Sequence, residues 1–193
     1  MREGLDIKEA AMKALLVNDV QNDFCPGGAL AVPDGDRIVP VINNLMDRFD
    51  LVLASRDWHP PDSRHFERWP VHCVRDTKGA DYHADLNTAG IDLELFKGTG
   101  NVDDGYSAFE ATNLNFLNLL REKGVTELYV TGIATEYCVR ATVLEALKNN
   151  IRTFVVTDAV KAIAARPGDE KMALDEMVRA GAELVSSQAL RSL

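Results

Sequence analysis

Short apolar runs alternate with segments of helical periodicity along most of this chain. The runs are apolar throughout rather than alternating, which is typical of strands buried on both faces of a parallel sheet. The pattern predicts strands over residues 13–19, 50–57, 91–98, 126–132, 151–160 and 182–187. It predicts helices over residues 37–49, from about 114 to 124, 135–150 and 167–181. We therefore expect an α/β fold of three layers, in which a doubly wound six-stranded parallel sheet is covered by helices on both faces.

Two segments interrupt this alternation. Residues 20–35 are rich in Gly, Pro, Asn and Asp, and residues 58–92 have no sustained period. A long irregular stretch inside a compact domain is more often functional than idle. In doubly wound folds the site lies at the carboxyl ends of the strands. The sequence therefore predicts a site built from strand ends and from these two loops.

The composition is that of one ordinary globular domain. The chain has 193 residues, of which 46% are hydrophobic and 26% charged, and these fractions are near the averages for such proteins. We interpret residues 13–193 as a single domain and residues 1–12 as an N-terminal extension. No apolar run approaches the ~20 residues of a membrane span, and the acidic start does not have the order of a signal peptide. We therefore expect a cytoplasmic protein that binds no membrane.

The charge balance excludes one class of partner. Lys and Arg number 21 and Asp and Glu number 30, so the net charge is −9. An acidic chain without a basic cluster is not expected to bind nucleic acid. Self-association as a homo-oligomer is left open. The three cysteines are widely spaced and lack a Cys-x-x-Cys pair, so they predict neither a disulfide framework nor a zinc ribbon.

One cysteine occupies a position that favours chemistry. Cys138 falls in the first turn of the helix predicted over 135–150, where the helix end would lower the pKa of a thiol and backbone N–H groups could hold an oxyanion. No histidine is near it in sequence, but Asp19 and Lys97 end strands at the same edge of the sheet. A carboxylate beside a lysine can act as the base for a thiol. The alternatives are an inert core thiol and solvated strand-end charges.

Three of the four histidines gather in one loop. Asp57 and His59 are two residues apart on an extended segment, so their side chains point the same way, and His65 and His72 follow. Imidazole and carboxylate ligands suit zinc, with iron or manganese as alternatives. A surface cluster of loop histidines is the other interpretation. Aromatic residues in the same loops could form walls around a flat ligand ring; these are Phe24, Trp69 and Tyr106.

Five segments together resemble the nicotinamidases and pyrazinamidases of the isochorismatase-like cysteine hydrolase superfamily, over residues 13–185. These segments are LLVNDVQNDFCPGGAL, SRDWHPPDSRHF, WPVHCVRDTKGADYH, FKGTGNVDDGYSAF and VTGIATEYCVRAT. The resemblance implies a catalytic triad of Asp19, Lys97 and Cys138. It implies the metal ligands Asp57, His59 and His72, and adds His65, which is a ligand only in some members.

The resemblance also implies how a substrate is held. The peptide bond between Ile133 and Ala134 would be cis, and the N–H groups of Ala134 and Cys138 would form the oxyanion hole. Phe24 and Trp69 match residues that sandwich a pyridine ring. With these we place two further residues in the predicted substrate-binding set, Tyr106 and Ile133.

The activity that the resemblance implies is hydrolysis of nicotinamide to nicotinate and ammonia through a thioester, with one divalent metal ion and with pyrazinamide as a further substrate. The main alternative is a metal-free amidase of the same superfamily that acts on an N-carbamoyl compound or a ureide. An isochorismatase proper is less favoured, because its chemistry does not use the cysteine. A catalytically silent binding module on the same fold is the alternative outside enzymes.

Overall fold

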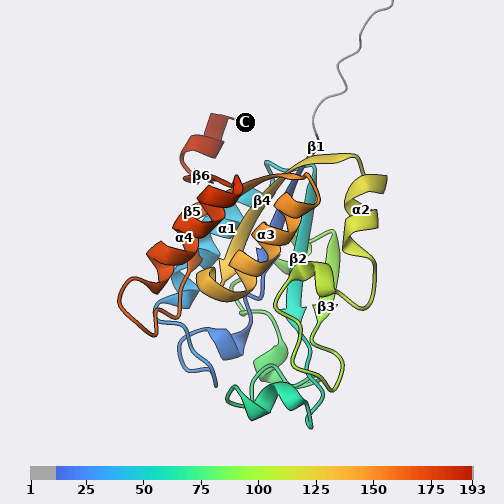
Figure 1. Ribbon diagram of the computed structural model, residues 1–193, viewed down its shortest axis with the longest axis vertical. Helices are drawn as coiled ribbons and strands as arrows, with labels where there is room; N and C mark the ends of the chain where they lie inside the picture. The colour runs from blue at the N-terminus through green and yellow to red at the C-terminus, as the bar shows by residue number, and fades with distance from the viewer. Residues whose placement is uncertain (1–11, 193) are drawn as a thin grey trace, which may run out of the picture.

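Six strands form one parallel sheet in the computed structural model, which describes residues 12–192. They are β1 Met12–Asn18, β2 Leu51–Asp57, β3 Leu93–Lys97, β4 Val125–Ile133, β5 Arg152–Lys161 and β6 Glu183–Val185. Their order across the sheet is β3-β2-β1-β4-β5-β6, and every neighbouring pair is parallel (Figure 1). The predicted doubly wound sheet is confirmed. Of the N-terminal extension predicted for residues 1–12, residues 1–11 lie outside the described residues, and Met12 begins β1.

Helices cover both faces of the sheet because successive strand residues point to opposite sides. On one face lies α1 (Val39–Met46), whose Ile42 and Leu45 share a hydrophobic core with Leu15 and Val17 of β1. The other face carries three helices, α2 (Phe116–Glu122), α3 (Arg140–Lys148) and α4 (Asp169–Ala180), whose buried side chains share a second core with Leu16 (Figure 1). Within residues 12–192, no helix has the length and apolar character needed to cross a membrane.

Two predicted helices begin differently from expectation. The helix expected over 37–49 opens as a 3₁₀ turn, Gly35–Ile38, before α1. The helix expected over 135–150 opens as a single π-helical turn, Thr135–Val139, in which the N–H of Val139 donates to the carbonyl of Ala134 at 3.2 Å. Hydrophobic periodicity cannot reveal a change of pitch confined to one turn. Such turns are frequent at functional sites, and this one carries Cys138.

The irregular segment 58–92 folds beyond the carboxyl ends of the strands, at the lower end of the molecule in Figure 1. Its helical structure is limited to short 3₁₀ turns, Arg64–Glu67, Lys78–Ala80 and Thr88–Gly90. The buried side chain of Gln21 fastens it, because its Nε2 donates to the carbonyls of Asp57 (2.8 Å) and Ala80 (2.9 Å). Its Oε1 accepts from the N–H of Asp57 at 2.8 Å. The loop that carries the histidines is thereby fixed to the end of β2.

Candidate active site and metal centre

Asp19 lies at the carboxyl end of β1, where β1 and β4 approach each other closely. Gly132 has a φ of 106°, and a Cβ there would lie 2.0 Å from the carbonyl oxygen of Asn18. Only glycine therefore allows the two strand ends to come this close. Directly after β1, Asp19 has a φ of 48° and is fully buried. The hydroxyl of Ser55 on β2 donates to its Oδ1 at 2.8 Å, which fixes the orientation of the carboxylate.

The ammonium group of Lys97 joins the predicted triad. The Nζ atom, at the end of β3, lies 2.8 Å from Asp19 Oδ2 and 3.6 Å from Cys138 Sγ. It also pairs with Asp57 Oδ1 and donates to the carbonyl of Gly105 at 2.6 Å. The side chain is fully buried, and a buried ammonium requires such a shell of acceptors. Three residues far apart in the sequence are thus brought into contact by the ends of parallel strands and by the π-helical turn.

Electrostatics set the protonation of the triad. Burial raises the pKa of Asp19 to about 6, against the opposing effect of Lys97. Burial disfavours the charge on Lys97, but Asp19 and Asp57 outweigh it and raise the pKa of the ammonium well above its usual value. Burial, with the two carboxylates, also raises the pKa of the Cys138 thiol well above its usual value. At neutral pH an ionised carboxylate therefore lies beside a protonated thiol.

The electrostatics of Cys138 correct one expectation from the sequence. The helix end was expected to lower the pKa of this thiol, but the side chain is buried and its largest influence is desolvation, which raises the pKa. Lys97 acts in the lowering direction and does not overcome burial. The thiol therefore depends on a neighbouring base to lose its proton, and Asp19 is close enough: the carboxylate oxygen and Sγ lie within 4.8 Å of each other.

Three buried imidazoles form a separate cluster. His59, His65 and His72 each offer a ring nitrogen, and these nitrogens lie within 4.8 Å of one another. Every Nδ1 is turned to an oxygen, namely the carbonyl of Gly98 (2.9 Å), Asp103 Oδ1 (2.7 Å) and the carbonyl of Pro70 (2.6 Å), respectively. An acceptor at Nδ1 fixes the tautomer in which Nε2 has a free lone pair, as in metal-binding histidines.

The cluster fits a divalent metal ion. The Nε2 atom of His59 is buried without a hydrogen-bond partner, which is a costly state unless a ligand occupies it. The Oδ2 atom of Asp57 lies 3.7 Å from this nitrogen and 3.9 Å from His72 Nε2, beyond hydrogen-bond length. Burial lowers the pKa of His65 and of His72, so both rings are neutral at pH 7. Three imidazoles and one carboxylate oxygen are a donor set suited to zinc or a similar ion.

A cleft connects the two clusters. Eight of the residues predicted for the site line it, namely Phe24, Trp69, Tyr106, Ala134, Cys138, Asp57, His65 and His72. Trp69 Nε1 donates to the hydroxyl of Tyr106 at 2.8 Å, so two of the aromatic walls are joined. Ile133 differs from the prediction, because its side chain packs in the core and is 1% exposed. Its peptide bond with Ala134 is cis, as the resemblance implied.

The sequence model of the isochorismatase domain matches residues 13–189. The chain belongs to the isochorismatase family. Among curated relatives of this isochorismatase-family protein, the nicotinamidase of Escherichia coli is 39% identical, over 89% of this chain and 93% of that protein. The nicotinamidase/pyrazinamidase of Mycobacterium tuberculosis is 39% identical, over 91% of this chain and all (100%) of that protein. The predicted family is confirmed.

A solved structure similar to this isochorismatase-family protein is that of the pyrazinamidase of Pyrococcus horikoshii in complex with zinc. Its TM-score is 0.82 and its sequence identity 43%, and the match covers 90% of this chain and 98% of that one.

Several residues of this isochorismatase-family site were not predicted from the sequence. Asp103 binds His65, the Gly105 carbonyl accepts from Lys97, and Tyr137 and Ile163 line the cleft. Asp103 could have been predicted from the sequence, because a carboxylate in the loop after β3 can pair with a loop histidine. Ile163 carries none, since a single apolar residue after a strand looks the same in a core and in a cleft.

Proposed function

We propose that this protein is a metal-dependent cysteine amidohydrolase that converts nicotinamide to nicotinate and ammonia and also accepts pyrazinamide. The observation that carries the proposal is the contact of Lys97 with Asp19, Asp57 and Cys138, the last two of which line an aromatic cleft. The relatives named nicotinamidase and nicotinamidase/pyrazinamidase support the choice of substrate.

The proposed reaction begins with Asp19 taking the proton of the Cys138 thiol. The thiolate attacks the amide carbon, and the N–H groups of Ala134 and Cys138 hold the oxyanion. The protonated Asp19 then gives its proton to the departing ammonia, which leaves a thioester on Cys138. Lys97 keeps its charge throughout and stabilises each anionic species. Asp19 finally removes a proton from a water molecule, which attacks the thioester. The tetrahedral species collapses to the free acid and the Cys138 thiolate, Asp19 returns its proton to the sulfur, and the acid loses a proton to solvent and leaves as nicotinate.

The metal ligands in this proposal are Asp57, His59, His65 and His72. When bound, a divalent ion, with zinc as the first choice and iron or manganese as alternatives, supplies a coordination point for the ring nitrogen of the substrate. The side chains of Phe24 and Trp69 line the same cleft and would bind the faces of the ring. The chain's own residues thus orient the carboxamide toward Cys138.

Ammonia release from a panel of amides tests the proposal. Nicotinamide and pyrazinamide should be hydrolysed, and benzamide, which has the same shape without the ring nitrogen, should be a much poorer substrate. A chelator should abolish turnover of nicotinamide, and added zinc should restore it. If the metal-loaded protein released no ammonia from either nicotinamide or pyrazinamide, the proposal would be refuted. Chelator-resistant hydrolysis of a ureide or an N-carbamoyl compound would instead favour the metal-free amidase.

A further inference from the structure

One carboxylate ties the turn that carries Cys138 to a distant loop. Glu136 lies in the π-helical turn, two residues before the thiol. Its Oε1 accepts from the N–H of Ala164 at 2.7 Å, and its Oε2 accepts from the N–H of Ile163 at 3.2 Å. Both amides belong to the segment between β5 and α4. Hydrogen bonds to an ionised acceptor are stronger than neutral ones, so this contact fixes the segment against the turn.

We call these two hydrogen bonds from the Ile163 and Ala164 amides to Glu136 the clamp. The segment that it holds forms part of the substrate cleft. Ile163 lines the cleft together with Ala134, Tyr137 and Cys138. The next residue, Ala164, has a φ of 51°, a conformation that alanine rarely adopts without support from its surroundings. The bond from its N–H to Glu136 supplies such support. The position of the Ile163 side chain is therefore determined by a carboxylate that does not itself line the cleft.

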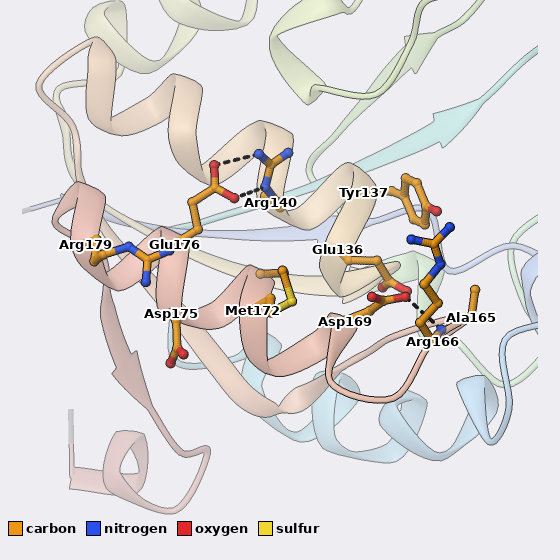
Figure 2. Close-up of a pocket in the computed structure, with 11 residues that line it drawn as sticks. Glu136, Tyr137, Arg140, Ala165, Arg166, Asp169, Met172, Asp175, Glu176 and Arg179 are labelled. Atoms are coloured by element: carbon orange, nitrogen blue, oxygen red, sulfur yellow. Dashed lines mark hydrogen bonds and ion pairs between the residues drawn. The ribbon is translucent and has the colours of Figure 1, made fainter.

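The opposite side of the clamp faces a second hollow, shown in Figure 2, with a volume of about 700 Å³. Glu136 and Tyr137 line it from the π-helical turn, and Asp169 lines it from the start of α4 (Figure 2). Its arginine on α3, Arg140, binds Glu176 through two hydrogen bonds of 2.6 and 2.7 Å rather than Glu136. The Glu136 carboxylate thus binds the loop amides, although three arginines, Arg140, Arg166 and Arg179, line the same hollow.

We propose that Glu136 is a positioning residue that sets the Ile163 wall of the substrate cleft. The inference rests on the proposed function for its substrate. An apolar wall contacts the ring equally in the ground state and in the transition state, so loss of its position raises KM and leaves kcat nearly unchanged. Glu136 acts through Ile163, and the effects of the two residues should therefore not add.

The variants Glu136→Gln, Ile163→Ala and their combination test this inference. Glutamine offers one acceptor oxygen and presents an amide N–H₂ group to the other backbone N–H, so the clamp is broken at one bond. We expect Glu136→Gln to raise KM for nicotinamide about tenfold, with kcat changed by less than about twofold. The double variant should have a KM close to that of Ile163→Ala alone, as for two residues that act through one contact.

Glu176→Gln is the matched control, because it removes a carboxylate from the same hollow without touching the loop amides (Figure 2). It should leave KM unchanged. Hydrogen exchange at the Ile163 and Ala164 amides should accelerate in Glu136→Gln and not in the control, whether or not the protein hydrolyses nicotinamide. Unchanged exchange would overturn the clamp, and an additive double variant would overturn its action through Ile163. A wild-type protein that releases no ammonia would refute the proposed function and leave the exchange result to decide the clamp.

Discussion

Replacing Asp19 by asparagine tests its role as the base while most other contacts of the proposed site are kept. The substitution keeps the size of the side chain and an oxygen that can accept from Ser55, which is 2.8 Å from Oδ1 in the native protein. Lys97 retains its contacts with Asp57 and with the Gly105 carbonyl. The carboxylate that can accept the Cys138 proton is lost, and with it the ion pair between Asp19 and Lys97.

The expected loss of activity follows from the state of the thiol. Burial raises the pKa of Cys138 well above its usual value, so without a base almost no thiolate forms at neutral pH. A positioned general base contributes roughly 10²- to 10⁴-fold to a rate, and kcat/KM for nicotinamide should fall by that factor. The metal content should not change, because Asp19 is not among the proposed ligands.

The stability of the fold should not fall in Asp19→Asn, although the activity does. The pKa of Asp19 rises from 3.8 to about 6 on folding, so folding favours its protonated form. At pH 7 the charged carboxylate therefore destabilises the fold by up to about 3 kcal/mol. This penalty declines as the pH falls below about 6 and is gone below 3.8, the ordinary pKa of the group, whereas asparagine removes it at every pH. The thermal midpoint of Asp19→Asn should be at or above that of the wild type.

The pH profile provides a second measurement. In the wild type, kcat/KM should decline with a single protonation as the pH falls through the pKa of Asp19, because the protonated acid cannot accept the thiol proton. A bound divalent ion moves this decline below pH 6, since its positive charge favours the ionised carboxylate. Asp19→Asn should lack this decline. A variant that keeps more than a tenth of the wild-type kcat/KM, or the same acid limb, would refute the assignment of Asp19 as the base.

Three further substitutions test the neighbouring groups. Lys97→Met should leave the carboxylates of Asp19 and Asp57 buried without the lysine cation, which costs about 3–5 kcal/mol. The thermal midpoint should therefore fall by roughly 10 °C for a domain of this size. A midpoint equal to that of the wild type would contradict the buried ion pairs. His72→Ala should lower the metal content measured by atomic spectroscopy, whereas Cys138→Ala should abolish ammonia release and keep the metal. Full metal occupancy in His72→Ala would remove this residue from the ligand set.

Much of the site could be predicted because parallel strands deliver their ends to one edge of the sheet. Asp19 and Lys97 each follow an apolar run, and this alone places them at the same edge as Cys138. The histidine cluster was equally visible, since His59, His65 and His72 occupy one loop. These predictions needed only the order of the elements and the positions of polar residues at their ends.

Features that depend on three-dimensional packing could not be predicted in the same way. The π-helical turn at Thr135–Val139 changes the pitch within a single turn and leaves the apolar pattern intact. The burial that raises the pKa of Cys138 depends on the depth of the cleft, whereas the sequence shows only a helix end. The segment that carries Ile163 is held by hydrogen bonds from its backbone N–H groups to the Glu136 carboxylate. Hydrophobic periodicity contains no sign of such bonds.

Asp57 shows why the proposed triad and metal centre should be considered together. One of its oxygens pairs with Lys97, and the other faces His59 and His72. Burial raises the pKa of this carboxyl, but Lys97 and the histidines outweigh it, so the pKa is lowered and the group is ionised. A cation held by the histidines would share this negative charge with Lys97. The ammonium would then be less neutralised by Asp57 and would stabilise the Cys138 thiolate more strongly, so metal binding would favour the nucleophile as well as orient the ring.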